Sequence, residues 1–317
     1  MRGLHLLPGD INLQFIPRRI MFFVFSAMLV IASIGLYLSQ GLNYGIDFKG
    51  GILIEIKTTG GPADIKAMRS NLSGLGVGEI GLQEFGAPDE VLIRIQAQDG
   101  DEKAQQVAVD KVKSALGNGV EYRRTEFVGP KISDELLWDG IFAVSAAIFA
   151  ILCYVWFRFE WQFGMGAVVA LIHDVLSTIG IFALLGLEFN LSTVAAILTI
   201  AGYSINDTVV VYDRVRENLR RYKTLSLPEL LNNSINETLS RTVMTSVTTL
   251  LALLALYILG GEVIRGFSFA MIWGVIIGTY SSICLAVPVL LYMKIERRSS
   301  SGGADNEAEE AVTEQAP

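Results

Sequence analysis

The residues of this 317-residue chain that are best placed to do chemistry are polar side chains inside long apolar stretches. Asn206 and Asp207 lie in the segment Gly202–Asn218, which begins apolar and ends basic, and Gly202 is small enough to let helices approach closely. A carboxylate at the centre of a membrane helix costs roughly 2.5–3.5 kcal/mol on insertion scales, so it usually faces a helix bundle or a hydrated cavity. Asp207 is therefore either a protonatable or ion-pairing group on a transmembrane path, or a structural carboxylate bonded to Ser, Thr or Asn of a neighbouring helix.

His173 and Asp174 form a second polar pair near the middle of another apolar run. Histidine is the side chain whose charge changes near neutral pH. Asp174 is expected to pair with His173 or with Arg241, and the His–Asp pair either takes part in proton transfer or locks helices together. The only other histidine is His5, far away in sequence, so no metal site is expected. A Ser-His-Asp hydrolase is not expected either, because no strand–turn–helix context surrounds a serine.

Arg241 begins a Thr- and Ser-rich run on the same side of the membrane as Asp207. It either extends to the membrane surface as an anchor, or turns inward and pairs with ionised Asp207. In the second case, protonation of Asp207 releases Arg241 and gives a two-state switch. Asn206 points about 100° away from Asp207 on the same helix and is expected to hydrogen-bond another helix. Asp213 and Arg214 are expected at a solvated helix end.

Six apolar runs are long enough to cross a bilayer, which takes about 20 residues each. Together with a hydrophobic content of 51%, they predict an α-helical membrane protein rather than a soluble enzyme. The first run is expected to be retained, because it is too long for a signal peptide and has no convincing small-residue cleavage site. The expected spans are 20–38 and, within 137–293, 137–157, 164–186, 190–212, 242–260 and 266–293, with a cytoplasmic loop at 213–241. In that loop, a short interfacial helix is expected from Pro228.

Residues 40–135 have a different character, with dense charges and turn residues. Short alternating runs predict strands, and amphipathic runs predict helices. The order β-α-β-β-α-β predicts a small external α+β domain of the ferredoxin-like type. Its expected elements are 52–57, 62–72, 79–85, 91–97, 101–116 and 120–128, with a turn at 86–89. The preceding segment Asn43–Gly51 is expected to be a tight extended link, and not a phosphate loop, because no Gly-Lys-Ser/Thr follows.

Basic residues near the ends of the spans predict the orientation. They fall on the side shared by the N-terminus, whereas the short loops 186–190 and 260–262 hold only acidic charge. Both termini are therefore expected in the cytoplasm, with 1–19 as a short lead and 294–317 as a disordered acidic tail. No nucleic-acid-binding patch is visible, and the two cysteines are expected to be packing residues. The basic residues are Arg18, Arg19, Arg158, Arg214, Arg216, Arg220, Arg221, Lys223, Lys294, Arg297 and Arg298.

Three segments together resemble the SecF family, the smaller member of the SecD/SecF pair that assists protein export and belongs to the RND-type superfamily. They are Asn43–Gly51, His173–Val175 and Gly202–Asn218, and the resemblance extends from about residue 18 to 295. It implies six spans in the cell inner membrane, surrounded by lipid, with a large periplasmic domain. It also implies a SecD partner, association with the SecYEG channel and a YajC-type accessory subunit, and use of the proton motive force to promote translocation of preproteins.

Carried over by motif, Asp207 and Arg241 are the expected proton-path residues, with Asn206, His173 and Asp174 as further candidates. The resemblance implies structural hinge or anchor roles for Asp47, Lys49 and the glycines of the segment Asn43–Gly51. The structural motif residues are Gly45, Asp47, Phe48, Gly50, Gly51, Gly202, Asp213 and Arg214. No enzymatic activity and no cofactor are expected.

Two other functions remain open on the sequence. One is an RND-type exporter of lipids or small molecules, although such exporters usually fuse two units of this kind. The other is a passive scaffold for the translocon, in which Asp207 and Arg241 matter only for stability of the complex. The coupling ion is open as well, because an oxygen-lined Na⁺ site near Asp207 is chemically possible.

Overall fold

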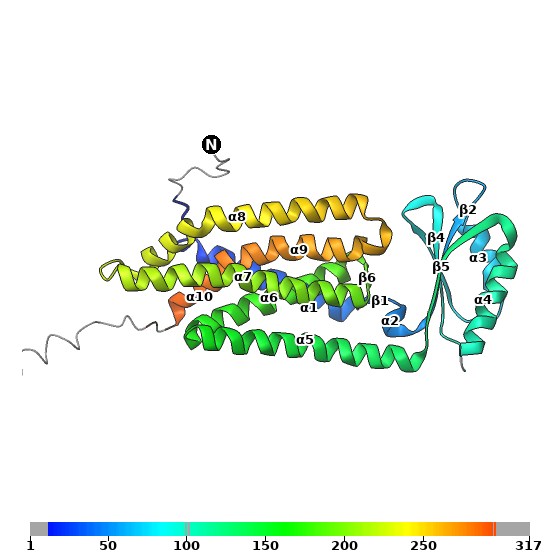
Figure 1. Ribbon diagram of the computed structural model, residues 1–317, viewed down its shortest axis with the longest axis horizontal. Helices are drawn as coiled ribbons and strands as arrows, with labels where there is room; N and C mark the ends of the chain where they lie inside the picture. The colour runs from blue at the N-terminus through cyan, green and yellow to red at the C-terminus, as the bar shows by residue number, and fades with distance from the viewer. Residues whose placement is uncertain (1–11, 99, 101, 294, 296–317) are drawn as a thin grey trace, which may run out of the picture.

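The computed structural model describes residues 12–98, 100, 102–293 and 295. A bundle of long helices forms one end of the molecule and a small sheet domain forms the other (Figure 1). Within the described residues, six helical stretches are long and apolar enough to cross a membrane. The expected lead at 1–19 is described only from residue 12, and the expected tail at 294–317 lies outside the described residues except for Ile295.

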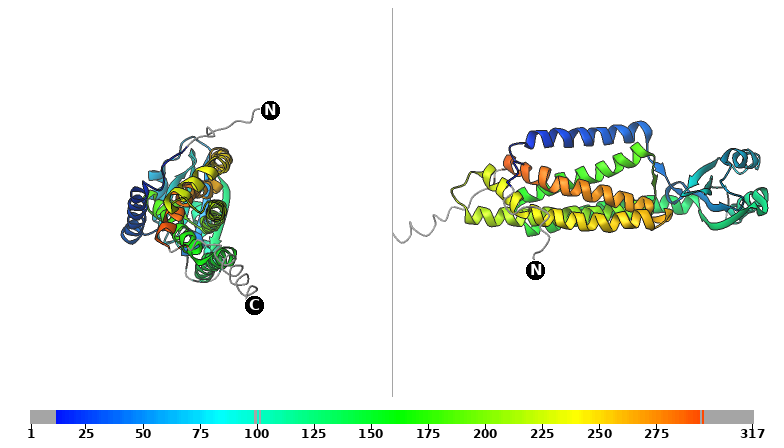
Figure 2. Two further views of the ribbon diagram at one scale, coloured as in Figure 1. Left: turned by 90° about the vertical axis from the view of Figure 1, so that its left-hand side faces the viewer. Right: turned by 90° about the horizontal axis from the view of Figure 1, so that it is seen from above.

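The bundle separates into buried and peripheral helices (Figure 2). Those nearest the centre are α6, α7 and the last stretch, whereas α1, α5 and α8 expose large apolar side chains, as membrane-facing helices do. The helices are α1 (Arg19–Gln40), α5 (Pro130–Arg158), α6 (Trp161–Leu185), α7 (Leu191–Arg221) and α8 (Leu227–Leu259). The last stretch contains α9 (Arg265–Ser281), a π-helical segment (Ser282–Ala286), α10 (Val287–Val289) and a 3₁₀ turn (Leu290–Tyr292). The π-helical segment ends just before Pro288, which has no N–H to donate to the helix.

The expected loop at 213–241 is wrong. Helices α7 and α8 continue through it and leave only residues 222–226 between them, so the expected interfacial helix is the beginning of α8. The connection is short because Ser226 caps α8 and the charged residues on either side are good helix formers. The two helices are also joined directly, since Asn218 Nδ2 donates a 3.0 Å hydrogen bond to Ser234 Oγ.

The sheet domain has the expected βαββαβ order, and its antiparallel strands lie in the order β3-β4-β2-β5. Alternate residues of β2 (Ile52, Ile54 and Ile56) form the core with residues of the two helices. Gly86, with φ of 86°, makes the β3–β4 turn alone, so the expected turn at 86–89 is shorter than predicted. The elements are β2 (Gly51–Thr58), α3 (Ile65–Ser73), β3 (Ile80–Phe85), β4 (Ala87–Ile95), α4 (Glu102–Leu116) and β5 (Val120–Val128).

The sequence predicts an extended link between the bundle and the sheet domain, but the observed link is not simply extended. It contains β1 (Asn43–Tyr44) and a helical turn, α2 (Ile46–Lys49). Strand β1 pairs in parallel with β6 (Glu188–Phe189), which lies between α6 and α7. Gly51 has φ of 125°, and a Cβ there would lie 2.5 Å from the carbonyl oxygen of Ile95, so only glycine fits.

Candidate functional site

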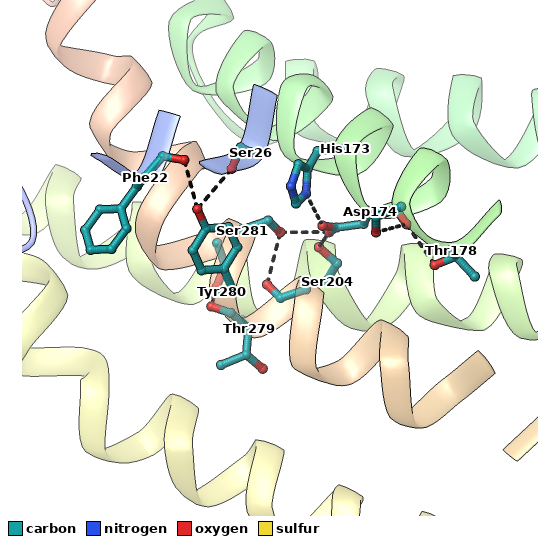
Figure 3. Close-up of polar contacts among 12 residues, drawn as sticks. Phe22, Ser26, His173, Asp174, Thr178, Ser204, Thr279, Tyr280 and Ser281 are labelled. Atoms are coloured by element: carbon teal, nitrogen blue, oxygen red, sulfur yellow. Dashed lines mark hydrogen bonds and ion pairs between the residues drawn. The ribbon is translucent and has the colours of Figure 1, made fainter. Parts of the chain in front are cut away.

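The most buried carboxylate among the described residues of the bundle is Asp174, whose exposed fraction is 0%. Side chains from neighbouring helices surround it (Figure 3). Its Oδ2 accepts hydrogen bonds from Ser204 Oγ at 2.5 Å and from Ser281 Oγ at 2.8 Å. Its Oδ1 lies 3.0 Å from His173 Nδ1. These contacts join α6, α7 and α9 at one carboxylate, so Asp174 is the polar centre of the three most buried helical stretches.

His173 is the partner of Asp174, as one of the two expected alternatives predicts; Arg241 makes no ion pair with Asp174 in the described part of the chain. The Nδ1 atom carries a proton whenever the neighbouring carboxylate is ionised, because a carboxylate only accepts hydrogen bonds. The Nε2 atom is buried, with no hydrogen-bond partner among the described residues. The ring lies beside Tyr280, whose hydroxyl is 3.0 Å from Ser26 Oγ of α1.

A second polar chain crosses the bundle through α7, α8 and α9. Tyr203 donates to Ser246 Oγ at 3.4 Å, and the hydroxyls of Ser246 and Thr279 lie 2.6 Å apart. Most other hydroxyls of the Thr- and Ser-rich run bond to backbone carbonyls of their own helix, as Thr245 does with Arg241. Most hydroxyls of this run are therefore satisfied within their own helix and are not left unpaired toward lipid.

Asp207 is buried on α7, with an exposed fraction of 4%. Its Oδ2 has no hydrogen-bond partner among the residues that the structure describes, and the same holds for the hydroxyls of Thr208 and Thr242. The alternative in which Asp207 is a structural carboxylate bonded to Ser, Thr or Asn predicts such a partner. Asp207 thus differs from Asp174, both of whose oxygens have partners.

The alternative in which Arg241 pairs with Asp207 is not present as an ion pair among the described residues, although the two side chains interact electrostatically. Arg241 is exposed. Asn206 is exposed too and, contrary to expectation, has no hydrogen bond to another helix within the described chain. Gly202 is also exposed, and a Cβ on it would meet nothing within 4 Å, so it does not serve close packing inside this chain.

Asp213 does not lie at a helix end, because α7 continues to Arg221. Its oxygens accept two hydrogen bonds from Arg158 Nη2 of α5, at 2.8 and 2.9 Å. Arg214 pairs with Glu217 on its own helix and, at 2.5 Å, with Glu237 of α8. Asp213 and Arg214, which were expected to be solvated, thus join neighbouring helices at the end of the bundle far from the sheet domain.

The motif at 43–51 lies against the turn between α6 and α7. A Cβ on Gly45 would lie 2.5 Å from Glu188 Oε1, and Phe48 packs on Tyr44 and Phe189. Asp47 Oδ2 accepts a 2.9 Å hydrogen bond from the backbone N–H of Leu191. The anchor role expected for this motif therefore has a defined partner.

Glu188 forms an ion pair with Arg94 of β4. Burial raises the pKa of the Glu188 carboxyl, and the charge of Asp47 raises it further, while Arg94 acts in the opposite direction. The junction therefore holds a carboxyl group that is protonated more readily than an exposed glutamate.

Comparison with known proteins decides the family. A family model described as "Protein export membrane protein SecD/SecF, C-terminal" matches residues 108–296, and a "SecD/SecF GG Motif" model matches residues 38–61. The protein translocase subunit SecF of Cereibacter sphaeroides is 48% identical over 303 residues, which cover 93% of each chain. The chain belongs to the SecF family. SecF subunits of Rhodobacter capsulatus and Rickettsia bellii are 48% and 46% identical over 93% and 90% of this chain.

A solved structure supports the same assignment. The crystal structure of SecDF, a translocon-associated membrane protein from Thermus, superposes with a TM-score of 0.82 and 36% sequence identity. The match covers 91% of this chain but only 40% of the SecDF chain. This SecF-family chain is thus a multi-pass membrane subunit of protein export, and it corresponds to about two fifths of that longer chain.

The sequence did not point to several residues that build these sites in the SecF-family chain. Ser281 gives no signal, because a serine in an apolar helix usually bonds to its own backbone. Arg94 and Glu188 lie 94 positions apart and belong to different elements, so neither predicts the other. The matched GG motif does include Asp47, but its partner Leu191 is an apolar residue that contributes only its backbone.

Proposed function

We propose that this SecF-family subunit couples proton movement to protein export, with Asp207 as the group that gains and loses the proton. The observation that carries the proposal is the buried Asp207 carboxylate whose Oδ2 lacks a hydrogen-bond partner among the described residues. A buried carboxylate that is incompletely hydrogen-bonded is costly when charged, so its environment responds strongly to protonation. Arg241 is the nearby positive charge that favours the ionised state. The subunit's own role is non-catalytic.

A SecD-type partner is proposed to cover the polar face of α7 and α8. Exposed polar and small residues in a membrane helix are unfavourable against lipid, and typical of contacts between helices. The face contains exposed Thr199, Gly202, Asn206, Arg241, Thr245 and Thr248. The longer SecDF chain, of which this chain matches 40%, supports a SecD-type region as the occupant. The partner would place its own helices against Asn206 and Arg241 and complete the proton path.

The positions of the basic residues support the proposed orientation. Arg158, Arg214 and Arg216 lie at the end of the bundle opposite the sheet domain, which supports a cytoplasmic location for that end in the cell inner membrane. The sheet domain would then lie on the periplasmic side, where it can act on an emerging preprotein beside the SecYEG channel and a YajC-type subunit. One proton crossing 100 mV releases about 2.3 kcal/mol, enough to shift two packings that differ by a few kcal/mol.

Export of a secretory protein into inverted membrane vesicles tests this proposal. The vesicles contain the channel, the SecD-type partner and either the wild type, Asp207→Asn or the control Asp213→Asn on the same helix. We expect Asp207→Asn to abolish the gradient-dependent part of export while leaving the part that does not depend on the gradient, and Asp213→Asn to retain most of both. Dissipating the proton and sodium gradients separately identifies the ion. Unchanged gradient-dependent export by Asp207→Asn, with the complex intact, would leave the scaffold function as the better explanation.

The proposed partner surface predicts the effect of Gly202→Leu. Gly202 is exposed and a Cβ there meets nothing within 4 Å, so folding should be little affected, whereas partner binding should weaken about tenfold if helices pack on this face. The measurement is co-purification with the SecD-type partner, with thermal unfolding of the isolated subunit as the check on folding. Gly35→Leu, at an equally open exposed glycine of α1, is the control and should bind normally. Normal binding by Gly202→Leu would show that the partner binds another surface of this chain.

A further inference from the structure

Asp47 connects two parts of the molecule that are far apart in sequence. Its Oδ2 accepts a 2.9 Å hydrogen bond from the N–H of Leu191, the first residue of α7. The first N–H groups of a helix have no partner within the helix, and a carboxylate is favoured there by the helix dipole. Asn190 caps the same helix through Thr193 N–H, so Asp47 supplies an acceptor that the local sequence does not.

The same short segment is fastened to the α6–α7 turn at further points. Gly45 N–H donates to the carbonyl of Phe189 at 2.9 Å, and the Asn43 side chain donates to the carbonyl of Gly186 at 3.0 Å. Arg94 of β4 pairs with Glu188, so the sheet itself also reaches this turn. The start of α7 is therefore held by the segment that leads directly into β2.

Helix α7 is one uninterrupted helix from Leu191 to Arg221, so a displacement of the helix at one point also displaces its first turn. Asp207 lies sixteen residues after Leu191, which corresponds to about 24 Å along the axis. A shift or rotation of α7 caused at Asp207 therefore moves its first N–H groups, and with them whatever is bonded to them.

We propose that Asp47 is a positioning residue that transmits displacement of α7 to the sheet domain, and so links the state of Asp207 to the position of that domain. The inference rests on the proposed function of Asp207. In Asp47→Leu, the N–H of Leu191 loses its acceptor, so only the contacts with the α6–α7 turn still join the start of α7 to the link between β1 and β2, and displacement of α7 is transmitted less completely. In Asp47→Asn the amide oxygen still accepts this hydrogen bond, so coupling is largely retained.

The test uses the complex with the SecD-type partner and the channel in vesicles. We expect Asp47→Leu to reduce gradient-dependent export about tenfold, the factor that corresponds to losing one hydrogen bond to a charged group, while gradient-independent export persists. Asp47→Asn should restore most of the gradient-dependent part. The matched control is Asp64→Leu, which removes a capping carboxylate of α3 that accepts from Ala67 N–H inside the sheet domain. It should change domain stability without a selective loss of gradient-dependent export.

A distance measurement separates transmission from simple stabilisation. Spin labels at Ser70 of the sheet domain and Val263 near the outer end of α9 are introduced after replacing Cys153 and Cys284. Asp207→Asn should shift the distance distribution when position 47 is the wild-type Asp or Asn, and should shift it clearly less in Asp47→Leu. An equal shift in Asp47→Leu, or unaltered gradient-dependent export by it, overturns the inference and leaves the role of Asp207 intact. Full gradient-dependent export by Asp207→Asn overturns both.

Discussion

Asp174→Ala is expected to destabilise the bundle by about 3–5 kcal/mol, the usual effect of removing one partner from a buried charged network. The carboxylate accepts from Ser204 and Ser281 and faces His173, and all three side chains are buried. Its loss leaves the buried hydroxyl of Ser204 and the imidazole of His173 without this acceptor, while Ser281 keeps only its 3.2 Å bond to the carbonyl of Gly278. It also removes the shared contact of α6, α7 and α9, so the effect should be on folding rather than on one step of transport.

Thermal unfolding of the purified subunit in detergent measures this effect, together with the yield of folded protein. Asp213→Ala is the matched control, because it removes a carboxylate whose ion pair with Arg158 is about 42–44% exposed. Exposed pairs contribute about 0–1 kcal/mol, so that variant should unfold close to the wild type. A midpoint for Asp174→Ala equal to that of Asp213→Ala would show that the network contributes little to stability.

Gly180→Ala is expected to push α1 away from α6. A Cβ at this position would overlap the side chain of Ser33 and lie 2.7 Å from its Cα, so no rotamer change of Ser33 relieves the clash. Ser33 is one of the few buried residues of α1, and α6 is its main neighbour. Overpacking typically costs about 1–3 kcal/mol, and Gly180→Val should cost more because the backbone itself must move.

Protease sensitivity at the two ends of α1 and the unfolding midpoint of the subunit report this displacement. Gly164→Ala is the control, because a Cβ at Gly164, on the same helix α6, meets nothing within 4 Å. It should be neutral or slightly stabilising, since alanine favours a helix more than glycine does. Equal protease sensitivity and equal unfolding midpoints of Gly180→Ala and Gly164→Ala would mean that α1 adjusts its position without a loss of stability.

The sequence predicted the elements whose pattern is local. Six long apolar runs and the βαββαβ order follow from hydrophobic period and length, and both are present. The boundaries near 213–241 were wrong because apolarity ends where the membrane ends, whereas a helix continues as long as its residues favour it. The pairing of β1 with β6 had no signal, because two-residue strands that are far apart in the sequence have no period to detect.

The candidate site was predicted in its ionisable members but not in its geometry. Asp174, His173 and Asp207 stood out because charged groups are rare in apolar helices. Which of these groups has hydrogen-bond partners depends on small residues such as Ser204 and Ser281. Serine is common in helices, so its presence in the sequence does not predict such a contact. Asn206 was expected to bond within the bundle but faces outward, because the sequence of one chain does not show which helix faces belong to a complex.

The unbroken helix α7 has a practical consequence for measurement. Its 31 residues measure about 46 Å, whereas a hydrocarbon layer is about 30 Å thick, so the helix projects well beyond the lipid at the end where it turns into α8. The Asn218–Ser234 bond keeps the two projecting helices together. A fluorophore attached at the exposed position of Arg220 would therefore report rotation of α7 about its own axis. The rotation of α7 that the proposed coupling predicts could be followed from outside the bilayer without altering any residue inside it.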